Sequence, residues 1–452
     1  MKVNWLGGSG KFMGTKSFDV EKTVMELIMS DDAAKKKQLG KMILGIAYKE
    51  GVYPSSIHEF YMARGRGEFG GFTVPAINLR SITYDLARSM YRVAKKNNSG
   101  AFVFEIARSE IGYTDQPPIE YSSVVLAAAI KENYSGPVFV QGDHFQVNAT
   151  KFKENPDKEM ESLRALIADA ISSGFYNIDI DSSTLVDLSK PDLKEQQLLN
   201  YKVCAKLTQF IRGIEPKGIT VSVGGEIGEI GHQNSTPEDL HAFVAGLREI
   251  LPRGLVGINK ISVQTGTTHG GIVLPDGSIA QINLDFNTLR TLSEIARKEY
   301  GLAGAVQHGA STLPPEAFHK FVECETAEVH LATEFQNMIY ESKHFPPDLK
   351  KRIYEWLKTN AANEAKQGET EEQFLYKTRK KALGPFKKEI MGLPQKTRDA
   401  IASEVENRFD FLFKQLNAVN KKDLVDRYAR KPSFTDSHDV NARPHAKPLP
   451  NT

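Results

Sequence analysis

The sequence predicts an α/β protein built on a (β/α)8 TIM barrel, and three observations lead to that prediction. Eight short β-rich runs follow one another between residues 71 and 333. Segments of helical length separate most of these runs, with apolar residues at the spacing of an amphipathic helix. Histidines and carboxylates follow several of the runs, where the functional residues of a barrel are found.

The eight β-rich runs define the strands that we expect. They cover residues 71–79, 101–108, 137–144, 176–183, 219–228, 256–266, 302–309 and 326–333. One connecting segment, 236–251, begins with Thr236 in the position of an N-cap and Asp239 three residues later, close to a capping box. Alternating units of this kind also build open doubly wound sheets, but eight is the number of strands in a barrel.

The chain is longer than a barrel alone. It has 452 residues, whereas a (β/α)8 barrel needs roughly 250, so we expect additions at both ends. The expected parts are an N-terminal helical extension (1–70) with one amphipathic helix at about 18–49, the barrel (71–340), a C-terminal helical extension (341–430) and a polar tail (431–452). The C-terminal extension should pack on the barrel or on a neighbouring subunit, and the tail resembles a poorly ordered segment.

Composition excludes several classes of protein. The formal net charge is +2, from 58 basic and 56 acidic residues, so overall charge gives no support for binding to nucleic acid or a membrane. Only two cysteines are present, which argues against a disulfide framework and for a reducing compartment. The N-terminus has no apolar signal core, and no apolar run reaches about 18 residues. We therefore expect a soluble, cytoplasmic protein.

Metal-binding side chains gather at the expected strand ends. His144, His269 and His308 lie at or just beyond three of these ends, and Glu226 ends a fourth strand. A single histidine at a strand end is usually a loop or core residue. Three imidazoles and a carboxylate on converging strand ends suit zinc, which keeps one position open at catalytic sites. The sequence therefore predicts a zinc site, with another divalent metal as the alternative.

Six motifs in this order resemble the class II (zinc-dependent) fructose-bisphosphate and tagatose-bisphosphate aldolase family, over roughly residues 70–340. They are FTVPAINL, PVFVQGDHF, IDIDSSTL, the EIG of 226–228 with TGTTHGG, and VQHGAS. The resemblance implies the metal ligands His144, Glu226, His269 and His308, with Asp181 able to contact the metal in an alternative position. It implies that Asp143 is the acid/base residue, although such an aspartate can instead orient a metal-bound histidine.

The resemblance also implies a set of substrate-binding residues, with some departures. The set is Asn78, Ser109, Gly270, Gly309, Ser311, His330 and Thr333. The family's second acid/base segment is altered, which leaves Glu229 or His232 as its substitute. A phosphate-binding lysine of the family is replaced by Ile272 and Val273. Arg80 or Lys260 could supply the lost cation, although a charge at the surface or at the barrel bottom is the commoner role. The basic runs 35–37 and 377–381 are expected on solvated helix faces.

The function that the resemblance implies is that of an aldehyde-lyase of carbohydrate metabolism, such as glycolysis. It would make or cleave the C3–C4 bond of a ketose through a zinc-stabilised enediolate, with a general base acting on the C4 hydroxyl. The expected partners are a small-molecule sugar or sugar phosphate, in a homodimer or a larger homo-oligomer. One alternative is a C4-epimerase that works by retro-aldol and aldol steps on an unphosphorylated sugar or sugar acid. Another is a noncatalytic sugar-binding barrel.

Overall fold

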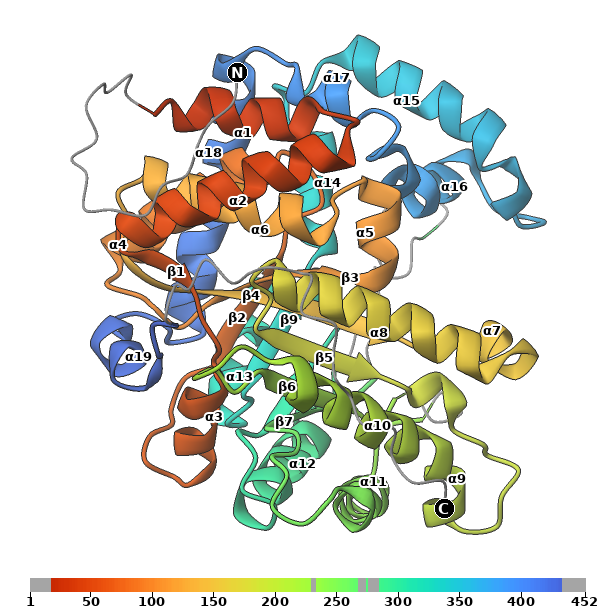
Figure 1. The fold of residues 1–452 in the computed structure, drawn as a ribbon. Helices are drawn as coiled ribbons and strands as arrows, with labels where there is room; N and C mark the ends of the chain where they lie inside the picture. The colour runs from red at the N-terminus through yellow and green to blue at the C-terminus, as the bar shows by residue number, and fades with distance from the viewer. Residues whose placement is uncertain (1–17, 229–232, 267–273, 275–283, 433–452) are drawn as a thin grey trace.

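The computed structural model of the protein describes residues 18–228, 233–266, 274 and 284–432. Its centre is a closed barrel of eight parallel strands, β2 to β9 (Figure 1). Each strand pairs with the strand before and after it in the chain, and the pairing of β2 with β9 closes the ring. The predicted (β/α)8 barrel is therefore confirmed, and the open doubly wound sheet is excluded.

All eight barrel strands overlap the eight predicted runs. They are β2 (Val74–Asn78), β3 (Val103–Ala107), β4 (Gly136–Gln146), β5 (Asn177–Asp181), β6 (Ser222–Glu226), β7 (Lys260–Val263), β8 (Ala305–Gln307) and β9 (Glu328–Leu331). Almost every strand residue is buried, because helices cover the outside of a parallel barrel and side chains fill its interior. A further strand, β1 (Val52–Pro54), pairs with the start of β4. Its three residues are too few to give a periodic signal, and the sequence did not predict it.

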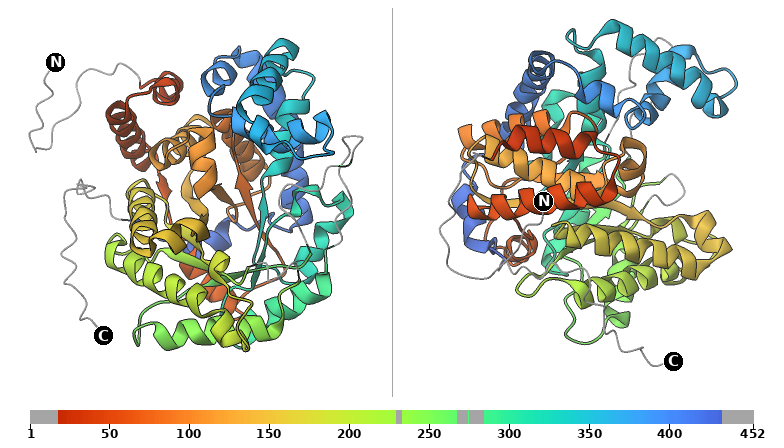
Figure 2. Two further views of the ribbon diagram at one scale, coloured as in Figure 1. Left: turned by 90° about the vertical axis from the view of Figure 1, so that its right-hand side faces the viewer. Right: turned by 45° about the horizontal axis from the view of Figure 1, so that its top comes forward.

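Helices surround the strands, as both views of Figure 2 show. Those between β1 and α14 are α3 (His58–Gly65), α4 (Thr83–Lys96), α5 (Arg108–Thr114), α6 (Pro118–Lys131), α7 (Ala149–Glu154), α8 (Pro156–Ser172), α9 (Leu193–Gln196), α10 (Leu198–Ile214), α11 (Pro237–Ile250), α12 (Phe286–Lys298), α13 (His319–Glu323) and α14 (Thr333–Glu341). The capping box predicted for α11 is confirmed, since the Thr236 hydroxyl accepts from the Asp239 N–H and the Asp239 carboxylate accepts from the Thr236 N–H.

Among the described residues, no helix is long and apolar enough to cross a membrane.

The N-terminal part contains two helices where the sequence predicted one. α1 (Val20–Met29) and α2 (Ala33–Lys49) are separated at Ser30–Asp32. The Asp32 carboxylate accepts the backbone N–H groups of Ala34 and Lys35, so it starts a new helix instead of continuing the first. Both helices pack on α6 (Figure 1). The prediction of a single helix at about 18–49 is wrong because this cap was overlooked.

The C-terminal helices pack on the barrel of their own chain. They are α15 (Pro347–Asn360), α16 (Glu371–Thr378), the short 3-10 helix η5 (Arg379–Ala382), α17 (Lys387–Met391), α18 (Gln395–Gln415) and α19 (Lys422–Tyr428). α18 lies along α4, and η5 contacts α5. The division of the chain at residues 70 and 340 stays a prediction, and most of the tail predicted at 431–452 lies outside the described residues.

The two basic runs are not wholly solvated, contrary to the prediction. Lys36 is buried and its ammonium lies 2.5 Å from the Glu120 carboxylate on α6. Arg379 is buried between α14 and α16, with its guanidinium 2.6 Å from the Glu341 carboxylate. In each run at least one basic residue therefore joins an extension to its neighbouring helices. The short runs of like charge concealed these buried pairs.

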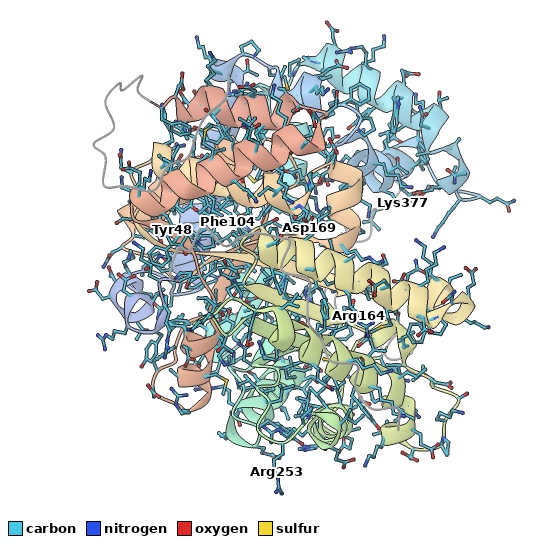
Figure 3. All side chains as sticks on the ribbon, in the orientation of Figure 1. Tyr48, Phe104, Arg164, Asp169, Arg253 and Lys377 are labelled. Atoms are coloured by element: carbon cyan, nitrogen blue, oxygen red, sulfur yellow. The ribbon has the colours of Figure 1, made fainter. Side chains whose placement is uncertain are left out.

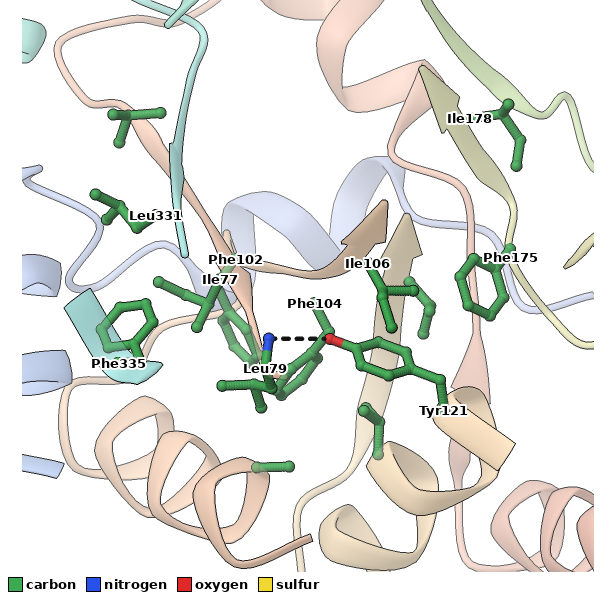
Figure 4. Close-up of a cluster of buried hydrophobic side chains, with 14 of the residues drawn as sticks. Ile77, Leu79, Phe102, Phe104, Ile106, Tyr121, Phe175, Ile178, Leu331 and Phe335 are labelled. Carbon is green, nitrogen blue, oxygen red and sulfur yellow. Dashed lines mark hydrogen bonds between the residues drawn. The ribbon is translucent and has the colours of Figure 1, made fainter. Parts of the chain in front are cut away.

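The core lies between the strands and the outer helices. Figure 4 shows Phe104, Ile106, Leu331 and Phe335 among the side chains that fill this space, and Figure 3 shows Arg253 at the surface by contrast. Tyr121 ties α6 to the barrel, since its hydroxyl donates to the Glu105 carbonyl at 2.6 Å and accepts from the Leu79 N–H at 3.4 Å. This packing fixes the ends of β2 and β3, which border the cavity described next.

Candidate metal centre

A bulge in β4 places two consecutive side chains in the site. The pairing of β4 with β5 shifts its register between Gly142 and Phe145. His144, inside the bulge, has φ +38°, a left-handed conformation that is uncommon outside glycine. Neighbouring residues of a regular strand point to opposite faces, whereas a bulge redirects a side chain. Asp143 and His144 therefore both reach the cavity at the end of the barrel.

His144 lies among carboxylates from the next two strands. Its Nδ1 is 3.0 Å from Asp181 Oδ2 and 3.2 Å from Glu226 Oε2. Asp181 is held in turn by Gln146 Nε2 at 2.5 Å and by the Ser183 hydroxyl at 2.7 Å. The three side chains of His144, Asp181 and Glu226 are close enough together to share one metal ion.

Asp143 joins this cluster to two further histidines. Its Oδ1 lies 3.3 Å from His308 Nε2 and 3.2 Å from His330 Nδ1. The His308 ring also lies beside the His144 ring, with 4.2 Å between their centroids. Asp143, His144 and His308 form a second group that could hold a metal ion. His144 belongs to both groups, so the two define one centre.

The electrostatics of the centre favour a bound cation. Burial, together with Asp181, raises the pKa of Glu226 to about 7. Burial would also raise the pKa of Asp143, but His144 and His330 hold it well below its usual range. Despite burial, Asp143 and Glu226 raise the pKa of His144 well above 6.5, so a proton on this ring supplies positive charge to the carboxylates. Burial and the neighbouring His330 and His144 lower the pKa of His308 well below its usual range, which favours the neutral form that binds a metal.

The donor set therefore fits a divalent metal such as zinc. Imidazole nitrogens and carboxylate oxygens are zinc ligands, and a metal ion would replace the charge that the proton on His144 provides. Of the predicted ligands, the structure brings together His144, Glu226, His308 and Asp181, while His269 lies outside the described residues. Glu229 and Gly270 also lie outside them. The individual roles stay predictions.

A second charged cluster fills the barrel interior beside this centre. Lys260 on β7 is 1% exposed, and its Nζ lies 2.6 Å from Glu328 Oε1 and 2.9 Å from Asp179 Oδ2. His330 contacts both Glu328 and Glu105, at 2.6 and 2.8 Å. Lys260 is thus a buried charge at the N-terminal end of β7, inside the barrel, and the expectation of a surface charge is wrong.

Glu105 and Glu328 were missed from the sequence. Both are completely buried, and burial raises the pKa of Glu105 to about 8 although His330 opposes the shift. The available signal was their position in two predicted β-rich runs, where Glu105 interrupts the apolar strand β3 and Glu328 begins β9. A charge in such a strand needs a partner inside the barrel.

The centre opens into a cavity of about 600 Å³. The predicted substrate-binding residues among its lining are Asn78, Ser109, Gly309, Ser311, His330 and Thr333. Asn78 donates from Nδ2 to Glu110 Oε2 at 2.6 Å, while its buried Oδ1 has no hydrogen-bond partner among the described residues. The Ser311 hydroxyl accepts from the Ala332 N–H at 2.9 Å. The cavity volume is in the range of small-molecule sites. Polar and charged side chains make up most of its lining, which suits a polar ligand.

Comparison with known families identifies this arrangement. The family model described as "Fructose-bisphosphate aldolase class-II" matches residues 66–410. The chain belongs to the class II fructose-bisphosphate aldolase family. Class II aldolases use zinc, and the residue groups that share His144 are candidates for holding it. No curated protein sequence matches the chain.

Solved structures resemble this aldolase family member in fold. One, described as a "probable tagatose 6 phosphate kinase" from Sinorhizobium meliloti 1021, is 16% identical, with a TM-score of 0.52. The match covers 78% of this chain and 99% of that one. Fructose-bisphosphate aldolase from Campylobacter jejuni is 18% identical, with a TM-score of 0.46, over 82% of this chain and 97% of its own. At these identities the likeness concerns the fold alone.

Proposed function

We propose that the protein is a metal-dependent aldolase that makes or cleaves the C3–C4 bond of a ketose. The observation that carries this proposal is the position of Asp143, which lies between His308 and His330 and directly precedes His144 in the candidate metal centre. A metal site with a charged general base beside it, in one cavity, is the arrangement that the reaction needs. Family membership supports the reaction class and implies a sugar or sugar phosphate substrate.

The residues that would hold the metal are His144, Glu226 and His308, together with His269, and with Asp181 as an alternative contact. Zinc bound there supplies, as a Lewis acid, the positive charge that stabilises the anion left on the ketone fragment. The glycines and hydroxyls of the β8 and β9 ends border the same cavity and are suited to bind the substrate's polar groups.

Asp143 acts as the general base in this proposal. In the cleavage direction its carboxylate removes the proton of the C4 hydroxyl, and in condensation it returns that proton to the aldehyde oxygen. Its contacts with His308 and His330, at 3.3 and 3.2 Å, fix its orientation. Asn78 Oδ1, which has no partner among the described residues, is available to accept a substrate hydroxyl.

The test uses zinc-loaded protein and follows carbon–carbon bond formation. Dihydroxyacetone phosphate or unphosphorylated dihydroxyacetone is the donor, and D-glyceraldehyde 3-phosphate or D-glyceraldehyde is the acceptor. We expect a ketose to form, the reverse cleavage of that ketose, and loss of both on chelation with recovery on added zinc. If the folded, zinc-loaded protein forms no ketose from any of these donor–acceptor pairs, the proposal of an aldolase that acts on three-carbon fragments is overturned.

One observation favours C4 epimerisation as a second candidate. The phosphate-binding lysine of the family is replaced by Ile272 and Val273, and His330 is bound by Glu105 and Glu328 inside the barrel, so the phosphate-binding end is altered. An aldolase centre that retains both fragments can rotate the aldehyde and rejoin it, which inverts C4. Inversion of a ketose or keto sugar acid without release of a triose would identify this reaction.

A further inference from the structure

The C-terminal extension contributes a cation to the cavity. Lys380, in η5, lies at the cavity mouth, and its Nζ is 5.9 Å from the centre of the Tyr113 ring on α5. The segment around it is fixed, since the Gly384 N–H donates to the Tyr113 carbonyl at 2.9 Å and Arg379 is bound to α14. Among the described residues, no carboxylate lies within ion-pair distance of Lys380.

Arg80 lies on the same wall, two residues beyond the end of β2. Its Nη2 is 2.6 Å from Glu110 Oε1 and its Nη1 donates to Gln336 Oε1 at 3.2 Å, so the guanidinium is held between α5 and α14. Its Nε is buried and has no hydrogen-bond partner in the part of the chain that the structure describes. A buried donor without a partner inside a ligand cavity indicates a group that a ligand completes.

The loop that carries Arg80 is unusual in its backbone. Ile82 has φ +40°, a left-handed conformation that β-branched residues rarely adopt. Gln116 stabilises this loop, since its Nε2 donates to the carbonyls of Leu79 and Arg80 at 3.2 and 3.3 Å. Backbone strain of this kind persists where the surrounding structure enforces it and is concentrated at ligand-binding sites. The orientation of Arg80 is therefore built into the fold.

The carboxylates on this wall do not balance the two cations. Glu110 forms an ion pair with Arg80, but it also accepts hydrogen bonds from Asn78 Nδ2 and from the Ala107 N–H, at 2.6 and 2.8 Å. Partial burial and the nearby Arg80 cation lower the pKa of Lys380. Arg108 lines the cavity too, but it is paired with Glu159 on α8. An anion placed between Arg80 and Lys380 would relieve the repulsion between them.

We propose that Arg80 and Lys380 form an anion subsite that binds the phosphate or carboxylate group of the substrate. A guanidinium fork and an ammonium are the two groups with which proteins hold such oxyanions. That the anion belongs to a ketose or to its aldehyde fragment rests on the proposed function. The subsite also assigns a role to the C-terminal extension, which places Lys380 beside a barrel residue that is 300 positions earlier in the chain.

The first test measures binding without catalysis. Inorganic phosphate is titrated into zinc-loaded protein by calorimetry, for the unaltered chain and for Lys380→Met. We expect binding to weaken about tenfold to a hundredfold, as for the loss of a hydrogen bond to a charged group. Lys381→Met is the matched control, because Lys381 is the next residue of η5 and is paired with Glu364. Equal phosphate affinity in Lys380→Met and the unaltered chain would overturn the subsite, whatever reaction the protein catalyses.

The second test separates phosphate from carboxylate. Condensation with a fixed ketone donor is measured for D-glyceraldehyde 3-phosphate, for the carboxylate analogue tartronate semialdehyde and for neutral D-glyceraldehyde. We expect Lys380→Met and Arg80→Lys to raise KM about tenfold or more for the anionic acceptor that the subsite binds, and to leave KM for D-glyceraldehyde within about twofold. An equal rise in KM for all three aldehydes would mean that the residues only shape the cavity, and would overturn the proposal.

Discussion

The cavity has two walls of opposite charge. On one, at the ends of β4, β5, β6 and β8, the carboxylates of Asp143, Asp181 and Glu226 lie around the imidazole of His144. On the other, after β2 and along α5 and η5, Arg80 is paired with Glu110, and Lys380 has no carboxylate within ion-pair distance among the described residues. Even with a proton on His144, the first wall carries more carboxylates than cations, and the second carries more cations than carboxylates. The difference indicates that each wall is completed by a ligand of the opposite sign.

The two walls also share a feature of the backbone. His144 has φ +38° on the metal wall, and Ile82 has φ +40° in the loop of the cationic wall. Neither is a glycine, so both positions carry conformational strain that the surrounding packing must offset. On the metal wall, the bulge at His144 turns side chains into the cavity that a regular strand would place elsewhere.

The largest effect is expected from removing His144, which belongs to two of the four candidate metal-binding groups and joins them into one centre. His144→Ala takes away a donor that no neighbouring side chain can replace, so we expect bound zinc and all aldol activity to be lost. The zinc content of the protein, measured after dialysis against buffer with a trace of zinc, checks this result. His319→Ala, an exposed histidine on α13, is the control and should retain its zinc. A full complement of zinc in His144→Ala would show that the metal wall is assigned wrongly.

Asp143→Asn should separate metal binding from proton transfer. The amide keeps the shape of the side chain but removes the base, so we expect zinc to stay bound while kcat falls about 10²-fold to 10⁴-fold. Metal analysis and steady-state kinetics on the same sample provide the measurement. A kcat within about tenfold of the unaltered enzyme would leave Asp143 only the role of orienting His308. Asp187→Asn, on an exposed loop, controls for the loss of a charge.

The barrel could be predicted from the sequence because each strand has a recognisable apolar pattern in its own local sequence. β5, for example, is a short buried run bounded by turns, and its pattern does not depend on distant residues. Two features of the fold were not predicted from the sequence. β1 has only three residues, and the start of α2 is decided by a single capping residue, Asp32. Short elements and single caps carry too little pattern to be distinguished from ordinary helix or loop sequence.

The two walls differ in how far the sequence foretold them. His144, Asp181, Glu226 and His308 could be placed together because strand ends of a barrel converge, whatever their separation along the chain. Lys380 could not, because its run of basic residues resembles a solvated helix face and only the docking of η5 on α5 brings it to the cavity. The same holds for Lys260, whose partners lie on other strands. Pairings set by tertiary packing leave no trace in local spacing.

Lys260→Met tests the charged interior beneath both walls. The substitution leaves the buried carboxylates of Asp179 and Glu328 without their shared cation, so we expect the free energy of unfolding to fall by about 3–5 kcal/mol. Urea or guanidinium unfolding measures the change. Lys298→Met, which removes an exposed helical pair, should cost less than about 0.5 kcal/mol. Equal losses in the two variants would mean that the interior carboxylates take up protons and need no cation.

The smallest effect, and the one that compares the walls directly, is that of Glu110→Gln. Removing this negative charge leaves Arg80 and Lys380 less compensated, so we expect the affinity for inorganic phosphate to rise about threefold to tenfold, as for a screened Coulomb change of about 1 kcal/mol. The same substitution on the other wall, Glu226→Gln, should act with the opposite sign and weaken zinc binding, because there the carboxylate attracts the ligand. Glu161→Gln, on an exposed position of α8, should change neither affinity. If Glu110→Gln lowered phosphate affinity, Glu110 would be holding Arg80 in position more than it opposes the anion, and the two walls would not be the electrostatic opposites that their charges suggest.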